Sequence, residues 1–208
     1  MIFGGDLLAN YKKLACDFCE PDFVDYYNVT GLSRNDWLDN QRAQRFLDKY
    51  SYLNKPLPPE WTISKQSIFK TPFEKEDYLF PTTVFKNGYI VSCKKSGCLF
   101  DKEGYEALQN SLVRLGEDWL FIDKVQEKYD PLPLCLSVPT QTSWKELISG
   151  GFIASFLFGF PHGFFFLFGT SASWGLFVAN DAIYDVEILG VKYSVSHCFT
   201  PYYDYCVL

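Results

Sequence analysis

The sequence predicts an α+β fold, in which an antiparallel or mixed sheet is flanked by two to four helices. Three observations lead to this prediction. Apolar residues recur at helical spacing in the N-terminal quarter, the Asn-Gly pair at 87–88 is a strong hairpin signal, and the C-terminal third alternates aromatic runs with glycine-containing turns. Together they favour helices and short antiparallel strands in one chain.

The chain has 208 residues, which is enough to bury a full hydrophobic core. We expect a single α+β domain over residues 1–208. Within it, the stiff proline-rich loop 56–59 is the best candidate for a boundary between a helical N-terminal subdomain, 1–60, and a sheet-rich part, 61–208.

Two amphipathic helices are expected before this loop. The first begins at Gly5-Asp6 and ends at Glu20-Pro21-Asp22, and the second begins at Ser33-Arg34-Asn35-Asp36. The apolar stripe of the first helix is Leu7, Leu8, Tyr11, Leu14, Ala15 and Phe18. That of the second is Trp37, Leu38, Ala43, Phe46, Leu47 and Tyr50.

The middle of the chain predicts a hairpin, a helix and two further strands. Residues 78–85 and 89–93 flank the turn Lys86-Asn87-Gly88 and are expected to pair as strands. A helix follows from about Lys102 to Leu115, with Gly116 as its C-terminal cap. A buried strand over Trp119–Ile122 and a second strand over Leu134–Val138 come next.

The stretch 143–189 is the most unusual part of the sequence. It opens with the capping box Ser143-Trp144-Lys145-Glu146, in which the glutamate is expected to reach back to the cap, and it then carries no charge until Asp181. Its aromatic runs, 164–168 and 175–178, are followed by a third run, 184–189, in which Asp185 and Glu187 alternate with Val186 and Ile188. The pattern predicts a short helix and then a small antiparallel meander.

A membrane-spanning segment is the competing interpretation, because the uncharged interval exceeds the roughly 20 apolar residues that a span needs. Pro161-His162-Gly163 would leave backbone polar groups unpaired in lipid, and polar residues cluster between Thr170 and Ser173. Lys145 is the single basic residue near either end. Strands buried on both faces explain the same interval in a water-soluble fold.

Composition limits the classes of function. A net charge of −6 disfavours nonspecific binding to nucleic acid, which needs a basic surface. Twenty Phe and fourteen Tyr indicate a core built from aromatic rings. The first residues lack the basic start and apolar run of a signal peptide, so we expect a cytoplasmic protein whose seven cysteines are reduced.

Four cysteines have spacings that could supply thiolates to zinc: Cys16, Cys19, Cys93 and Cys98. However, Cys16 and Cys19 lie in a helical pattern and Cys93 ends a predicted strand, whereas zinc-binding pairs usually lie on tight turns. We therefore favour cysteines that act as small buried apolar residues, and we expect no metal and no cofactor. Metal analysis of the purified chain would decide between the two interpretations.

A hydrolase or transferase with an unrecognised active site is the alternative function. Its candidate catalytic residues are the nucleophiles Ser171 or Ser173, the base His197, and the orienting acids Asp185 or Asp204. The segment 169–173 lacks the final glycine of a nucleophile elbow, and its neighbours predict strand–turn–strand. A Ser/Thr-rich hairpin turn is the favoured interpretation.

Acidic residues dominate the C-terminal part of the chain. From Leu147 onward they face a single basic side chain, Lys192. A solvated acidic face explains this, and so does a docking surface for a basic protein partner, because complementary charge speeds encounter and confers selectivity. The residues predicted to bind such a partner are Asp181, Asp185, Glu187, Trp174 and Asp204.

Part of the C-terminal half resembles a known family. The segments that carry the resemblance are Ser143-Trp144-Lys145-Glu146-Leu147-Ile148-Ser149-Gly150, the run 164–169, Ser173-Trp174-Gly175-Leu176-Phe177-Val178-Ala179-Asn180-Asp181 and Ile188-Leu189-Gly190. They resemble small cytosolic immunity proteins that accompany bacterial polymorphic toxins. The resemblance implies a noncatalytic inhibitor whose acidic surface covers the active site of a toxin enzyme. We expect such a binding protein, with no nucleic-acid or membrane partner.

Overall fold

The computed structural model describes residues 34–52, 55–70, 81–95, 101–125, 134–158, 163–180 and 185–207. The first predicted helix lies outside these ranges, as do Cys16, Cys19, Cys98, His162 and Asp181. For Cys93 and Asp185 the backbone is described and the side chain is not.

The described part of the chain contains one antiparallel sheet of six strands, in the order β1-β6-β5-β4-β2-β3. Its strands are β1 (Tyr89–Lys95), β2 (Trp119–Lys124), β3 (Cys135–Pro139), β4 (Gly163–Phe168), β5 (Trp174–Asn180) and β6 (Asp185–Lys192). The α+β prediction is confirmed, and so is the antiparallel meander, which is β4-β5-β6.

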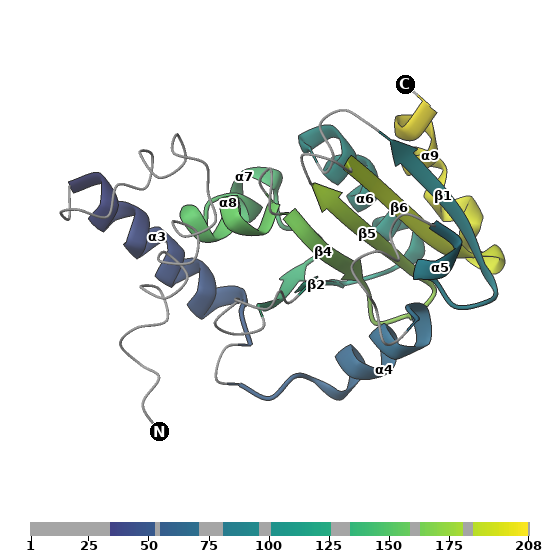
Figure 1. Cartoon of the computed structure of the whole chain (residues 1–208), viewed down its shortest axis with the longest axis horizontal. Helices are drawn as coiled ribbons and strands as arrows, with labels where there is room; N and C mark the ends of the chain where they lie inside the picture. The colour runs from purple at the N-terminus through teal and green to yellow at the C-terminus, as the bar shows by residue number, and fades with distance from the viewer. Residues whose placement is uncertain are drawn as a thin grey trace.

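Helices cover the sheet on two sides (Figure 1). The helices are α3 (Arg34–Tyr50), α4 (Pro59–Ile68), α5 (Pro81–Val84), α6 (Lys102–Leu115), α7 (Trp144–Leu147), α8 (Phe152–Phe158), the 3-10 helix η2 (Tyr193–Phe199) and α9 (Thr200–Val207). Side chains from α4 and the α5 region pack on one face, and those from α3, α6, α8 and α9 pack on the other.

Side-chain and backbone caps mark the predicted helix ends. The carboxylate of Asp101 accepts a 2.8 Å hydrogen bond from the amide of Gly104, and Gly116 ends α6 with a φ of 77° in the left-handed region. At α7 the hydroxyl of Ser143 accepts from the amide of Glu146 at 3.2 Å. The Glu146 carboxylate contacts Lys49 and Tyr50 of α3, so this side chain joins two helices rather than completing the predicted capping box.

The predicted hairpin between 78–85 and 89–93 is only half right. Residues 89–95 form β1, but 81–84 form the helical turn α5, and Phe85 makes an isolated bridge with Phe69. Pro81 occupies the first position of α5, where a proline ring fits a helix and the missing N–H costs nothing. The strand β1 instead pairs with β6, which lies far away in the sequence.

Burial on both faces explains the long uncharged interval. Phe166 and Phe168 of β4 pack against Trp61 and Phe69 on the α4 side, while Phe165 and its odd-numbered neighbour Leu167 join the core under α6, α8 and α9. A strand covered on both faces needs apolar side chains at successive positions. No helix in the described residues is long and apolar enough to cross a membrane.

Two glycines form the floor beneath the α4–α5 layer. Gly175 and Gly190 lie opposite each other on β5 and β6. A Cβ atom on Gly175 would lie 2.6 Å from Cζ of Phe69, and one on Gly190 would overlap the ring of Phe85. The Phe69 and Phe85 rings, whose centroids are 5.2 Å apart, therefore pack directly on the backbone of the sheet.

We expect Gly175→Ala to lower the free energy of unfolding by about 1–3 kcal/mol, because the added methyl group overfills a packed core. Chemical denaturation of the two proteins measures the difference. Gly116→Asn is the matched control, since that site is open and asparagine tolerates a left-handed backbone. If Gly175→Ala were no less stable than this control, the close approach of Phe69 to the sheet would be wrong.

Candidate functional site

A buried carboxylate holds the turn between β4 and β5. Glu117 directly follows the Gly116 cap of α6, and only 5% of its surface is exposed. It accepts hydrogen bonds from the amide and hydroxyl of Thr170, both at 2.6 Å, and from the hydroxyl of Ser171, also at 2.6 Å. The amide of Ser171 and the indole N–H of Trp174 each donate to it at 3.3 Å. Four neutral donors from the turn and one from the first residue of β5 thus converge on a single carboxylate.

This arrangement assigns a structural role to the serines of the hydrolase hypothesis. The Ser171 hydroxyl contacts the Glu117 carboxylate, and the Ser173 hydroxyl lies 2.8 Å from that of Ser171. His197 is exposed on η2, where its Nε2 lies 3.5 Å from Sγ of Cys198. The interpretation of 169–173 as a hairpin turn is confirmed.

Among the described side chains, those predicted to bind a partner are not all at the surface. Trp174 and Glu187 are buried, at 0% and 1% exposure, and the Glu187 carboxylate accepts a hydrogen bond from the Tyr202 hydroxyl of α9. Asp204 is exposed on α9. Asp185 pairs with Asn180 through the backbone, and Asp181 lies outside the described residues. The alternating pattern of β6 suggested an exposed Glu187, but the C-terminal helix covers that face of the strand.

No disulfide joins Cys135, Cys198 and Cys206. Their side chains are thiols, and within the described ranges no three potential ligands gather into a metal site. Burial raises the pKa of the Cys135 thiol, and the neighbouring Asp123 carboxylate raises this pKa further. Asp123 is itself paired with Lys65 of α4 at 2.5 Å. This cluster joins α4 to the sheet.

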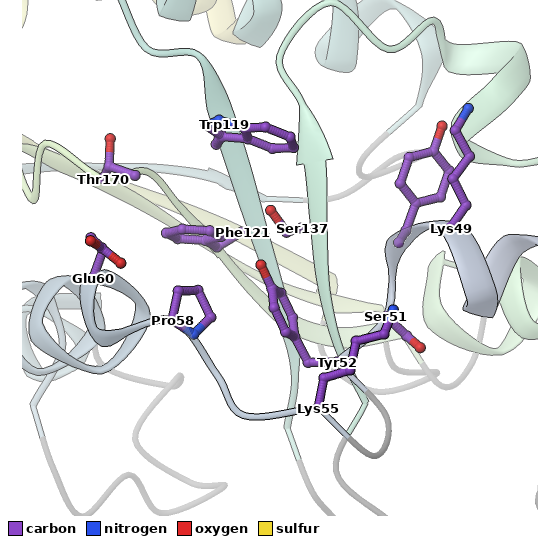
Figure 2. A pocket seen from close by; sticks show the side chains of 11 residues that line it. Lys49, Ser51, Tyr52, Lys55, Pro58, Glu60, Trp119, Phe121, Ser137 and Thr170 are labelled. Atoms are coloured by element: carbon purple, nitrogen blue, oxygen red, sulfur yellow. The ribbon is translucent and has the colours of Figure 1, made fainter.

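An aromatic groove opens beside β2 and β3, where the α4 layer ends (Figure 2). It encloses about 480 Å³. The rings of Tyr52, Trp119 and Phe121, together with Pro58, line it. Behind these residues the buried Trp61 packs 4.9 Å from Phe121 and 5.9 Å from Tyr52, measured between ring centroids. We call this site the aromatic groove.

Hydrogen bonds fix the walls of the aromatic groove. The Tyr52 amide donates to the carbonyl of Cys135 at 3.0 Å, which holds the segment after α3 against the edge strand β3. On the opposite wall the Ser64 hydroxyl of α4 donates to the carbonyl of Thr170 at 3.2 Å. Because Thr170 is held by Glu117, the buried carboxylate also positions this wall.

Charged side chains stand at the two sides of the aromatic groove. Lys49 and Lys55 lie near the end of α3, and Glu60 lies on the first turn of α4 (Figure 2). Lys49 pairs with the Glu146 carboxylate, which also accepts from the Tyr50 hydroxyl at 2.5 Å. Lys55 donates to the carbonyl of Asp48 at 3.5 Å. The groove is thus polar at its sides and aromatic along its floor.

Trp119 is the residue of this site that sequence reasoning placed incorrectly. The strand over 119–122 is confirmed as part of β2, but the prediction that it is buried fails at its first residue, whose side chain is 45% exposed. The four residues form an uninterrupted apolar run. Such a run does not indicate which of its residues the packed helices leave exposed. The exposure of Trp119 follows from the position of α4, which does not cover this side chain.

Comparisons with protein-family models, with curated proteins and with solved structures find no match to this chain. The arrangement of the site itself is therefore the basis for a function.

We expect Glu117→Gln to lower the free energy of unfolding by about 1.5–3 kcal/mol, because the turn loses charge-assisted hydrogen bonds and faces a new amide donor. Asp118→Asn removes the same charge from the next, exposed residue and should cost much less. Denaturant titration of both variants measures the difference. Equal stability of the two would show that Glu117 does not hold the turn.

The link between α3 and α7 should weaken in acid. Lys49, and after it Tyr50, hold the pKa of the Glu146 carboxyl below its ordinary range. The stabilisation is therefore complete above the ordinary pKa of a glutamate and is lost as the pH falls through the lowered value. The difference in melting temperature between the wild type and Glu146→Gln should be largest near pH 7 and should shrink progressively as the pH is lowered below the ordinary pKa of a glutamate. A difference that stays constant over this range would contradict the interaction.

Proposed function

We propose that this chain is a noncatalytic binding protein that captures a protein partner at the aromatic groove. The observation that carries the proposal is the 45% exposed Trp119, which lies in a groove beside Tyr52 and Phe121. Tryptophan and tyrosine are enriched among the residues that contribute most to protein–protein affinity, particularly in pockets that a partner can dehydrate. A single exposed ring is ordinary on a protein surface, whereas an exposed indole within a ring-lined groove is a ready anchor site.

The aromatic groove is also preorganised. Its floor rests on Trp61 and the sheet, and its walls are held by the Tyr52–Cys135 and Ser64–Thr170 hydrogen bonds. A site whose side chains are already fixed loses less conformational entropy when a partner binds. This rigidity favours recognition of one partner over adaptable, promiscuous binding.

The partner we propose is a basic toxin enzyme, and the chain would be its cytoplasmic, bacterial, immunity-type inhibitor. The resemblance of parts of 143–190 to immunity proteins supports this choice. The net charge of −6 supports it as well, since a negative protein attracts a positive one over long distances and accelerates their encounter. In this proposal the charge guides approach, and the aromatic groove supplies affinity.

We expect Trp119→Ala to weaken the complex roughly 30-fold, because a central anchor typically contributes about 2 kcal/mol or more. The partner is first captured with the wild-type chain and purified, and its affinity is then measured by calorimetry. Tyr193→Ala is the matched control, since this aromatic side chain is 82% exposed on η2 and is not among the residues that line the groove. The enzymatic activity of the partner should fall when the complex forms.

Two results would contradict the proposal. Equal affinities of Trp119→Ala and the wild type would remove the aromatic groove from the interface. A loss of affinity in Asp204→Lys without any loss in Trp119→Ala would place binding on the acidic surface near the C-terminus. In either variant a wild-type melting temperature confirms that the fold is intact.

A further inference from the structure

The side chains of the aromatic groove specify the kind of segment that fits it. Its floor consists of flat rings from Tyr52, Trp119 and Phe121 and the pyrrolidine ring of Pro58. Rings of this type form the grooves in which proline-containing segments bind, because a proline ring packs flat against an aromatic face. Such segments are already extended as polyproline II helices, so that they lose little entropy on binding.

The charges at the two sides are not equally available. Lys49 is already paired with Glu146. Glu60 is exposed, and among the described residues it has no ion-pair partner. Lys55 donates to a backbone carbonyl of Asp48, so that its charge is not neutralised by that contact. Glu60 and Lys55 therefore lie on opposite sides of the aromatic floor, one with an available negative charge and the other with an available positive charge (Figure 2).

We infer that the aromatic groove binds an extended, proline-containing segment of the partner, with a basic side chain directed at Glu60 and an acidic side chain directed at Lys55. This inference rests on the proposed function and names the chemistry of the segment that the site selects. Opposite charges at the two ends fix the direction of the bound segment, and the prolines between them cover Trp119. A neutral proline-rich segment would lack the charge contacts with Glu60 and Lys55 and would bind more weakly.

Two labelled peptides test the inference directly. One reads Arg-Leu-Pro-Pro-Leu-Pro-Glu, and the other is its reverse, Glu-Pro-Leu-Pro-Pro-Leu-Arg, because the direction of the bound chain is not known beforehand. Fluorescence anisotropy measures their affinity for the full chain. We expect one of the two to bind, and we expect replacement of its arginine by glutamate to weaken binding about tenfold.

The charge can then be exchanged on the protein. Glu60→Lys should weaken binding of the original peptide about tenfold and should restore binding of the peptide in which glutamate replaces arginine. Glu103→Lys makes the same change of charge on the exposed surface of α6 and should leave both affinities unchanged. Trp119→Ala should abolish binding of the original peptide, because the prolines lose the ring that they cover.

Three results would overturn the inference. The first is that neither peptide binds the wild-type chain, and the second is that the bound peptide is indifferent to Glu60→Lys. The third uses a chain labelled with 5-fluorotryptophan. If cellohexaose shifts the fluorine resonance of Trp119 and the peptides do not, the groove is a carbohydrate site. If the purified partner still requires Trp119 while the peptides fail, the inference falls and the proposed function stands.

Discussion

The structure depends on one buried charge, the carboxylate of Glu117. Removing a carboxylate from water is costly, and the cost is offset here by four donors from the turn between β4 and β5 and by the indole N–H of Trp174, the first residue of β5. Glycine is required at 169, since a Cβ atom there would overlap the carboxylate. Glu117 lies at the end of α6, on one side of the sheet, and holds Thr170. Thr170 in turn accepts a hydrogen bond from Ser64 of α4, on the other side of the sheet. The carboxylate therefore links the two helical layers.

The two helical layers explain both the composition and the position of the aromatic groove. A sheet covered on both faces requires apolar side chains at successive strand positions, and this chain supplies them largely as phenylalanine. The α4–α5 layer packs closely because glycines 175 and 190 admit the rings of Phe69 and Phe85. Trp119 stands at the start of β2, near the edge strand β3, where this layer ends. The groove therefore forms where the core is left open.

Features set by local contacts could be predicted from the sequence. The caps at Gly116 and Ser143 mark the end of α6 and the start of α7, and the glycine-containing turn at 169–173 separates β4 from β5. Features set by distant contacts could not. Glu187 is buried because α9 returns across β6, and the Tyr-rich tail has only a weak amphipathic pattern. The aromatic groove depends on four separate segments, so no single stretch of sequence indicates it.

Hydrogen exchange of the Thr170 and Ser171 amides tests the central role of Glu117 most directly. Both side chains are exposed in a surface turn, so that without the carboxylate these amides would exchange like those of an open loop. With both amides donated to Glu117, we predict protection comparable to that of the neighbouring strands β4 and β5. Exchange of Thr170 and Ser171 at the rate of an unstructured peptide would contradict the account.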